Sequence, residues 1–223
     1  ADLIPQSIAS GAIDRHLRPG HERDDRMEAE FPQTLDAAFR EAFRHHPAGV
    51  AVIAAEAGDG PVAITVSSLI SVSADPPTVA FSLSARSSSS AAILRAETMV
   101  IHFLRLADLQ IAQLGATSGA DRFGPGISWE RLPTGEPRYS AVTTWFRARV
   151  TGTLPVQGAT LVAAELLEGQ AQVADGSPES LSMVYVDRRW HGLRALLDEQ
   201  LWRTDSATGK RWRAAPALAA PSR

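Results

Sequence analysis

The spacing of hydrophobic and polar positions changes several times along the chain, and each change marks an expected element. Before about residue 30, charged residues mix with Gly and Pro without a sustained apolar period, which predicts an N-terminal arm. A helix is predicted next, because Leu35, Phe39 and Phe43 recur at every fourth position. Thr34 can cap the start of this helix, and Pro47 marks its end.

From residue 50 onward the pattern becomes strand-like. Residues 50–55 and 62–72 predict a hairpin with a long second arm, joined by a Gly-Asp-Gly-Pro turn. Short helices are predicted over 91–97 and 106–114, and further strands over 78–83, 99–104, 142–154, 161–173 and 181–186. About seven strands with only short helices between them favour a mainly β protein, built as a closed barrel rather than a doubly wound sheet.

The end of the chain predicts one more helix and a loose tail. An Ala/Pro-rich stretch begins at about residue 205, and the helix before it is marked by Leu193, Leu196, Leu197 and Leu201. The 223 residues are enough for one domain with a sizeable core. We therefore expect an arm over 1–30, one barrel domain over 31–192, and a C-terminal helix and tail over 193–223.

Composition and charge argue against several classes of function. A formal net charge of -3 argues against a general nucleic-acid binder, which needs a basic surface. The absence of cysteine removes disulfides, cysteine-ligated metals and a thiol nucleophile, and the six histidines show no metal-site spacing, so no metal is expected. No stretch approaches the ~20 apolar residues of a membrane helix, and the start lacks the order of a signal peptide. We expect a cytoplasmic protein without membrane or nucleic-acid partners.

Hydroxyl-bearing residues alternate with apolar ones along the second arm of the predicted hairpin. Thr65, Ser67, Ser71 and Ser73 follow this alternation, which places their side chains on one face of a strand. Such a face is either a solvated surface of the barrel, which is the commoner case, or a surface that binds a ligand.

The segment from Ser84 to Ser90 reads Ser-Ala-Arg-Ser-Ser-Ser-Ser and precedes a predicted helix. It offers the guanidinium of Arg86, several hydroxyls and the free amides of a helix start, which together suit a phosphate group. Serine-rich loops are common, so the order of the neighbouring segments is needed to interpret this one.

Six short segments follow one another in a characteristic order. They are Phe39-Arg40-Glu41-Ala42-Phe43 with Pro47-Ala48-Gly49-Val50-Ala51-Val52-Ile53, then Ile64-Thr65-Val66-Ser67-Ser68, Ser71-Val72-Ser73-Ala74-Asp75-Pro76-Pro77, Ser84 to Ser90, Asp121-Arg122-Phe123, and Tyr185-Val186-Asp187-Arg188-Arg189-Trp190-His191. This order, from about Leu35 to His191, resembles the short-chain flavin reductase family, the reductase components of two-component flavin monooxygenases. The resemblance implies a split β-barrel that binds FMN or FAD.

The resemblance also implies which residues hold the flavin. The strand residues expected along the isoalloxazine ring are Thr65, Val66, Ser67 and Ser68. The loop residues expected at the ribityl phosphate, in agreement with their charge and donors, are Ser84, Ala85, Arg86, Ser87 and Ser90. Phe123 would close over the nucleotide from the partner of a homodimer.

A closing strand near the flavin or the incoming nicotinamide is implied for Arg188, Trp190 and His191. Their alternative interpretation is a strand end with a buried tryptophan and solvated arginines.

Two positions depart from the family pattern. Many members carry Gly-Asp-His where this chain has Gly158-Ala159-Thr160, so that Thr160 stands at the nicotinamide position. His102 stands where the family usually has asparagine. It is either a contact on the ribityl side of the flavin or a hydrogen-bonded histidine of the barrel, and the second interpretation is favoured.

The function implied by the resemblance is NAD(P)H-dependent reduction of FMN or FAD, with hydride passing from nicotinamide to flavin N5 and reduced flavin supplying a partner monooxygenase. No residue is assigned as catalytic, because hydride transfer needs chiefly stacking and orientation. A homodimer is implied, with residues 106–114 and 193–201 offering apolar faces. The alternatives are a flavin carrier or sensor, an oxidoreductase subunit with another electron donor, which the Gly-Ala-Thr sequence keeps open, and a barrel without a ligand.

Overall fold

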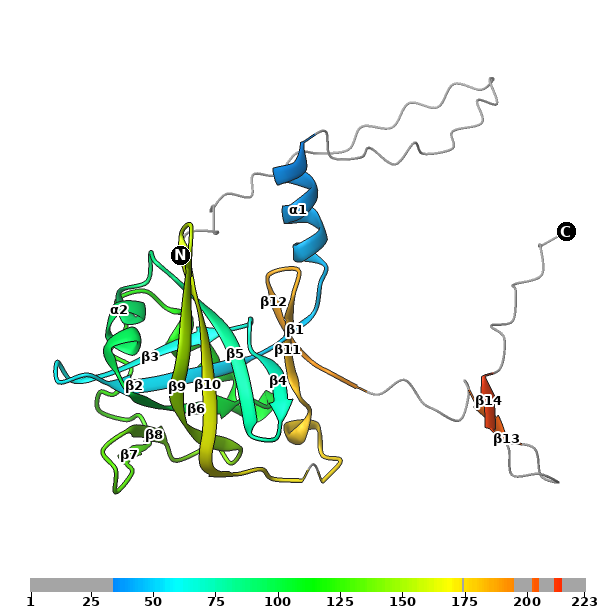
Figure 1. The fold of residues 1–223 in the computed structure, drawn as a ribbon. Helices are drawn as coiled ribbons and strands as arrows, with labels where there is room; N and C mark the ends of the chain where they lie inside the picture. The colour runs from blue at the N-terminus through cyan, green and yellow to red at the C-terminus, as the bar shows by residue number, and fades with distance from the viewer. Residues whose placement is uncertain (1–33, 174, 195–201, 205–210, 214–223) are drawn as a thin grey trace, which may run out of the picture.

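The computed structural model describes residues 34–173, 175–194, 202–204 and 211–213 (Figure 1). Its centre is an antiparallel sheet with the strand order β3-β2-β6-β9-β10-β5-β4. These strands are β2 (Ala51–Glu56), β3 (Pro61–Val66), β4 (Ile70–Ala74), β5 (Pro77–Ser84), β6 (Thr98–Phe103), β9 (Trp145–Val156) and β10 (Ala159–Gln170). The sheet curls around one interior, which confirms the predicted mainly β split barrel.

Alternate residues of the strands fill the interior of the barrel. Ile53 of β2, Phe81 of β5 and Ile101 of β6 are fully buried in this inner cluster. The intervening residues of β2, such as Val52, face a second buried layer outside the barrel wall that includes Tyr139. Because β2 is covered on both faces, its first five positions are all apolar.

Two short helices are held by the barrel. Helix α2 (Ser88–Arg95) closes one end of it, because Ile93 belongs to the inner cluster. Helix α3 (Leu109–Ala116) follows the 3-10 turn η1 (Leu106–Asp108) and packs against β3 through its buried Ala112 and Gly115. The apolar face predicted over 106–114 is therefore covered within the same chain rather than left free for a second subunit.

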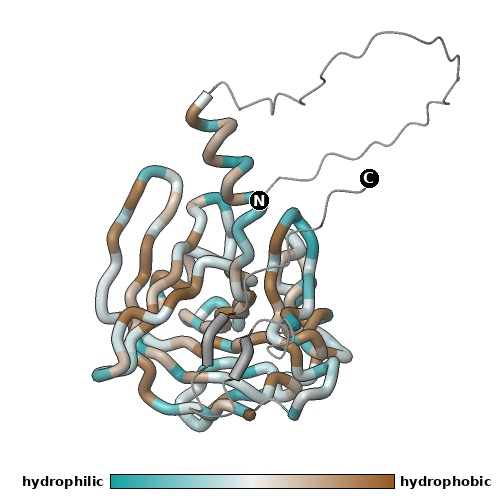
Figure 2. Tube along the Cα trace, turned by 90° about the vertical axis from the view of Figure 1, so that its right-hand side faces the viewer, coloured by the Kyte–Doolittle hydropathy of each residue, from teal (hydrophilic) through white to brown (hydrophobic). Residues whose placement is uncertain are grey.

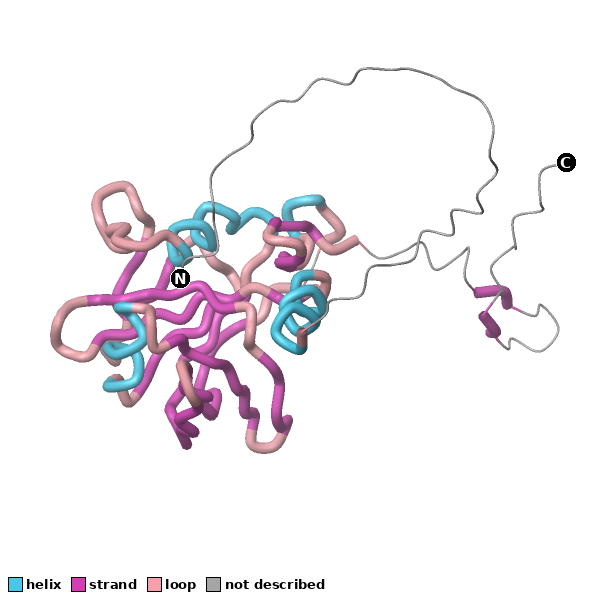
Figure 3. Tube along the Cα trace, turned by 90° about the horizontal axis from the view of Figure 1, so that it is seen from above, coloured by secondary structure: helices cyan, strands magenta, loops and turns pink. Residues whose placement is uncertain are grey.

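The remaining strands form small sheets around the barrel. They are the three-stranded sheet β1 (Ala48–Gly49), β11 (Met183–Val186) and β12 (Arg189–Gly192), and the pairs β7 (Trp129–Arg131) with β8 (Pro137–Tyr139) and β13 (Trp202–Thr204) with β14 (Arg211–Arg213). A short 3-10 turn, η2 (Pro178–Ser180), precedes β11. Figure 3 shows that strands outnumber helices in the described chain, with the short helices at its periphery.

Helix α1 (Leu35–Arg44) forms as predicted, and Thr34 caps it by accepting a hydrogen bond from the Ala37 N–H at 3.2 Å. None of its residues is buried, and the helix projects from the barrel (Figures 1 and 2). Its apolar face is formed by Leu35, Phe39 and Phe43, which are 88%, 58% and 61% exposed. The predicted helix is confirmed, and no described part of the chain covers that face.

Three sequence predictions need correction. The long second arm predicted over 62–72 is two strands, because β3 ends at Val66 and β4 begins at Ile70. Helix α2 begins at Ser88 rather than at 91, since the serine run supplies its first turn. Part of the tail predicted to be loose is the strand β14. The predicted arm over 1–30 and most of the helix predicted over 193–201 lie outside the described residues. Among the described helices, none has the length and apolar character to cross a membrane.

Candidate functional site

The segment after β3 meets strand β5 at the split of the barrel. The Ser68 hydroxyl accepts a hydrogen bond from the Ser82 N–H at 2.9 Å and lies 3.3 Å from the Ser82 carbonyl, to which it donates. This contact joins two segments that are 14 residues apart in the sequence. It leaves Ser67 exposed beside β5. The sequence analysis did not single out the Ser68–Ser82 pairing.

Thr65 and Val66 serve the fold rather than a ligand through their side chains. The Thr65 hydroxyl donates to the Ala112 carbonyl of α3 at 2.7 Å, and a Cβ at Gly115 would overlap that hydroxyl. Val66 points into the barrel interior and is buried. The hydrogen that the Thr65 hydroxyl could donate is therefore already used by α3, and a flavin contact at Thr65 through its backbone stays a prediction. Only the backbone of this stretch and Ser67 face outward.

The loop from Ser84 to Ser90 follows directly from β5, so it lies at the end of the strand that Ser68 contacts. Arg86 is four residues after Ser82, so the two Cα atoms are separated by at most roughly 13 Å, the length of an extended chain. Arg86 is exposed, and no ion pair with a described residue holds its guanidinium. The serine-arginine loop thus starts from the strand that Ser68 contacts, and their convergence on one nucleotide stays a prediction.

The donors of this loop are arranged around the start of α2. The N–H groups of Ser88 and Ser89 occupy its first turn, where a helix supplies no acceptor for them, and Ser87 makes no side-chain cap. The Ser90 hydroxyl is buried and has no hydrogen-bond partner among the described residues. Buried hydroxyls without partners are uncommon, because leaving one unpaired costs about 1–3 kcal/mol. Two free amides, an orphaned hydroxyl and a nearby guanidinium fit a phosphate group.

The turn between β9 and β10 lies beside the loop. The Ala85 N–H donates to the Gly158 carbonyl at 3.0 Å, and Thr160 stands opposite Leu83 in the β10–β5 register. Thr160 is half-buried. The structure therefore places Thr160 next to the serine-arginine loop, from a position about 75 residues further along the chain.

His102 lies inside the protein, away from this edge. One ring nitrogen, Nδ1, lies 3.1 Å from the Val52 carbonyl, and the other, Nε2, accepts a hydrogen bond from the Tyr139 N–H at 3.0 Å. The imidazole is therefore the Nδ1–H tautomer. Burial first, and then the charge of Arg138, lower its pKa to about 4, against the opposing effect of the Val52 carbonyl. His102 is therefore the hydrogen-bonded barrel histidine of the favoured interpretation, and its ring nitrogens are not free to contact a flavin.

Phe123 lines a separate open cavity of about 540 Å³ between the β2–β3 turn and β7. Its ring stacks on Tyr139 with 5.2 Å between ring centroids and meets Trp129 edge-on at 5.0 Å. The Trp129 indole N–H donates to the Phe123 carbonyl at 2.8 Å, which fixes the loop. No described contact joins Phe123 to the serine-arginine loop within one chain.

The β11–β12 hairpin carries Arg188, Trp190 and His191 and pairs with β1. Its two-residue turn has positive φ at Asp187 and Arg188 (48° and 58°). Trp190 packs on Tyr185 with 4.7 Å between ring centroids, while Arg188 and His191 are exposed. Figure 1 draws this hairpin away from α2, so a single chain does not bring it to the serine-arginine loop.

Comparison with known proteins identifies the fold and its family. The sequence model of the "Flavin reductase like domain" family matches residues 43–194, which is more than half of the chain. The chain belongs to this flavin reductase family. It is 40% identical over 139 residues to the NADH:FMN oxidoreductase of Rhodococcus erythropolis, covering 62% of this chain and 72% of that protein.

Two further relatives support the assignment. The chain is 30% identical over 158 residues to the reductase component of a 4-nitrophenol 4-monooxygenase/4-nitrocatechol 2-monooxygenase from Rhodococcus opacus, covering 70% of this chain and 83% of that protein. The crystal structure of a flavin reductase domain protein from Arthrobacter sp. FB24 superimposes with a TM-score of 0.66 at 30% identity, covering 72% of this chain and 97% of that one.

Within this flavin reductase, the expected site residues fall into two groups. Ser67, Ser68, Thr160 and the loop 84–90 share one edge of the barrel. Phe123 and the β11–β12 hairpin lie elsewhere on the same chain. A nucleotide held by both groups would require two copies of the chain.

Proposed function

We propose that this flavin reductase oxidises NADH and reduces FMN bound between Ser67 and the loop 84–90. The observation that carries the proposal is the convergence of the outward-facing Ser67–Ser68 segment and the phosphate-suited loop on one edge of the barrel. The name of the Rhodococcus erythropolis relative supports NADH and FMN as the nucleotides. FAD and NADPH are the alternatives that the assay below distinguishes. The unit proposed to carry the activity is the barrel, residues 31–192.

The residues of the loop would hold the phosphate by charge and by hydrogen bonds. Arg86 supplies the positive charge, the Ser88 and Ser89 N–H groups point along the axis of α2, and the Ser90 hydroxyl gains the partner it otherwise lacks. The Ala85–Gly158 hydrogen bond fixes the loop against the β9–β10 turn. The free N–H groups of the first turn are already in place, whereas the buried Ser90 hydroxyl has to turn toward the phosphate.

The Ser67–Ser68 segment would position the ring. It belongs to no strand, so its backbone groups are not used by a ladder partner, and the Ser68–Ser82 bonds hold it in place. When bound, the flavin supplies the redox chemistry, accepting a hydride from the nicotinamide. The protein's part is to orient the two rings, which is why the threonine at Thr160, in place of the family histidine, does not by itself remove the activity.

The activity is tested by anaerobic reduction of FMN. Purified chain with FMN and NADH is expected to lose the flavin absorbance band near 450 nm, with NADPH and FAD run as parallel arms. Bleaching that NADPH alone supports would change the donor, and bleaching of FAD alone would change the flavin. Protein that binds FMN but bleaches with neither donor would remove the reductase and leave a flavin carrier.

The chain is also proposed to act as a homodimer that covers α1. A ten-residue helix with no buried side chain is marginal in water, so its exposed apolar face needs a partner. A second copy is the partner that the site favours, because no described contact joins Phe123 or the β11–β12 hairpin to the loop 84–90 of their own chain.

If the homodimer forms through the apolar face of α1, a charge placed on that face should separate the subunits. Phe39→Asp is expected to convert a dimer to a monomer in size-exclusion chromatography with light scattering, because burying an unpaired carboxylate costs several kcal/mol. Ala37→Asp places the same charge on the opposite face of α1 and serves as the matched control. A wild-type monomer, or dissociation by both variants alike, would show that the α1 face is not the interface.

We also propose that the chain serves a partner monooxygenase and is located in the cytoplasm. The Rhodococcus opacus relative is the reductase component of a monooxygenase, which supports a similar role here. Reduced flavin released by this chain would be consumed by an oxygenase. Adding such an oxygenase and its substrate to the anaerobic mixture, then admitting air, tests that role through hydroxylated product.

A further inference from the structure

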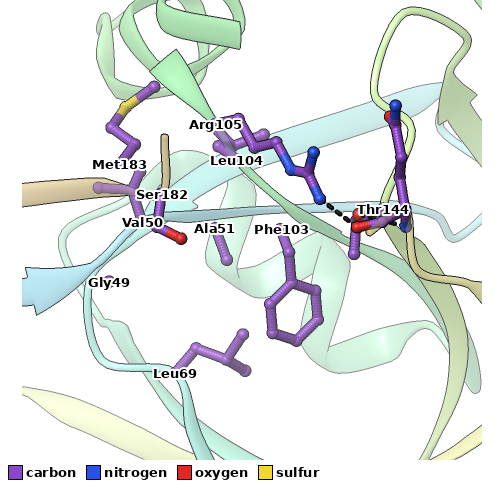
Figure 4. A pocket seen from close by; sticks show the side chains of 11 residues that line it. Gly49, Val50, Ala51, Leu69, Phe103, Leu104, Arg105, Thr144, Ser182 and Met183 are labelled. Atoms are coloured by element: carbon purple, nitrogen blue, oxygen red, sulfur yellow. Dashed lines mark hydrogen bonds between the residues drawn. The ribbon is translucent and has the colours of Figure 1, made fainter. Parts of the chain in front are cut away.

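A cavity of about 320 Å³ opens at one end of the barrel, and its lining includes Leu69, the residue after Ser68. Its lining consists of Gly49, Val50, Ala51, Leu69, Phe103, Leu104, Arg105, Thr144, Gln172, Ser182 and Met183 (Figure 4). None of the residues assigned above to flavin or nicotinamide is among them. The volume lies at the lower end of the range of small-molecule sites, roughly 300–1,000 Å³.

The interior of this cavity is apolar. Phe103 and Leu69 extend into it from the barrel side, and Ala51 and Met183 form its wall (Figure 4). Phe103 also meets Phe146 edge-on, with 5.7 Å between ring centroids, so its ring has a fixed orientation. An apolar space with an aromatic wall favours a ligand with a flat or branched apolar body.

One positive charge stands on the rim of the cavity. The Arg105 guanidinium donates to the Gln172 carbonyl, while the Asp108 carboxylate accepts instead from the Arg105 backbone N–H at 2.8 Å. No carboxylate of a described residue lies within ion-pair distance of the Arg105 side chain. The hydroxyls of Ser182 and Thr144 lie on the same rim. A guanidinium with unused donors favours a carboxylate.

We propose that this open end of the barrel binds a small monocarboxylate with an aromatic or branched apolar body, separately from the flavin. The apolar body occupies the space against Phe103 and Leu69, and the carboxylate pairs with Arg105 on the rim. The cavity lies between the β1–β2 segment, the end of β6 and the start of β11, and the Arg105–Gln172 and Gln172–Thr144 hydrogen bonds tie together the residues that follow β6, follow β10 and precede β9.

The proposal is tested by titrating the full chain with benzoate, benzyl alcohol and acetate in a calorimeter, with and without saturating FMN. Benzoate is expected to bind saturably in both conditions. Benzyl alcohol, which lacks the charge, and acetate, which lacks the ring, are expected to bind more weakly than benzoate. Arg105→Gln is expected to weaken benzoate about 10- to 100-fold, as the loss of a charged hydrogen bond predicts. Arg149→Gln, which removes an exposed arginine of β9 that does not line the cavity, is the matched control.

A second variant blocks the cavity without changing Arg105, so that a loss of binding does not rest on one substitution alone. Ser182→Phe adds a ring at an exposed position on the rim and is expected to abolish benzoate binding while Arg105 stays in place. No saturable benzoate binding, equal binding of benzyl alcohol, or displacement of benzoate by FMN would overturn the proposal. FMN binding and NADH oxidation, measured on the same preparations, report on the proposed function separately.

Discussion

His102→Ala is expected to lower the free energy of unfolding by about 3–5 kcal/mol, because it empties a fully buried site and removes two hydrogen bonds at once. The Tyr139 N–H would be left without a partner inside the protein, while the Val52 carbonyl would lose the ring and keep only its place in the β2–β6 ladder. Domains of this kind are stable by only about 5–15 kcal/mol, so the variant should unfold at much lower denaturant concentration. Urea denaturation followed by tryptophan fluorescence measures this. His45→Ala, at an exposed position after α1, is the control and should change little.

The same residue makes stability depend on pH. Above about pH 6.5 the imidazole is neutral in both states. Below that pH, His102 of the unfolded chain binds a proton. In the folded protein the pKa of His102 is about 4, so the same proton binds only when the pH is near 4. Stability should therefore fall by about 3 kcal/mol as the pH drops from 6.5 to 4. His102→Asn should remove that part of the slope, and an unchanged slope would show that other groups titrate there.

Glu136→Gln is the second large effect, and it acts at lower pH. Burial works to raise the pKa of Glu136, but hydrogen bonds from Thr134, Thr98 and Arg147 outweigh it and lower the pKa to about 2. Its carboxylate lies 2.7 Å from the Arg147 Nε and is 4% exposed. In the unfolded chain the pKa returns to about 4.5, so the ion pair stabilises the fold above that pH and is lost as the pH falls toward 2.

The expected loss at pH 7 is about 3 kcal/mol, and the variant should show a flatter stability profile between pH 4.5 and 2 than the wild type. Glu168→Gln is the matched control, since its carboxylate lies 3.8 Å from the same arginine but is 56% exposed. If the two variants lose the same stability, burial is not what makes the Glu136 pair strong.

Local patterns were enough to predict most elements of the fold. The spacing of Leu35, Phe39 and Phe43 predicted α1, because that period belongs to a helix whatever covers its face. The apolar run from residue 51 predicted β2, which is covered on both sides. The break between β3 and β4 was missed, since Ile70 and Val72 continue the alternation after Val66. The chain leaves the ladder there because Ser68 bonds the backbone of Ser82 on another strand, which no local pattern reveals.

In the candidate site, too, local patterns could not reveal contacts between distant segments. Arg86 and the serines before α2 were recognisable from their charge and donors alone. The hydrogen bond of the Thr65 hydroxyl to the Ala112 carbonyl could not be predicted, because that acceptor is 47 residues away. His102 likewise has partners 50 and 37 residues away, so its role in the core could be weighed but not decided from the sequence. Contacts between distant segments decide whether a polar side chain serves the fold or a ligand.

The proposed flavin site requires the phosphate to lie at Arg86. Comparing FMN with riboflavin tests this most directly, because the two differ only in the phosphate. Arg86→Gln should raise the dissociation constant of FMN about 10- to 100-fold, as loss of a charged hydrogen bond predicts, and leave that of riboflavin within about twofold. Arg95→Gln, at the other end of α2, should affect neither. Fluorescence titrations in which Arg86→Gln weakens both flavins equally, or leaves FMN unchanged, would contradict the account.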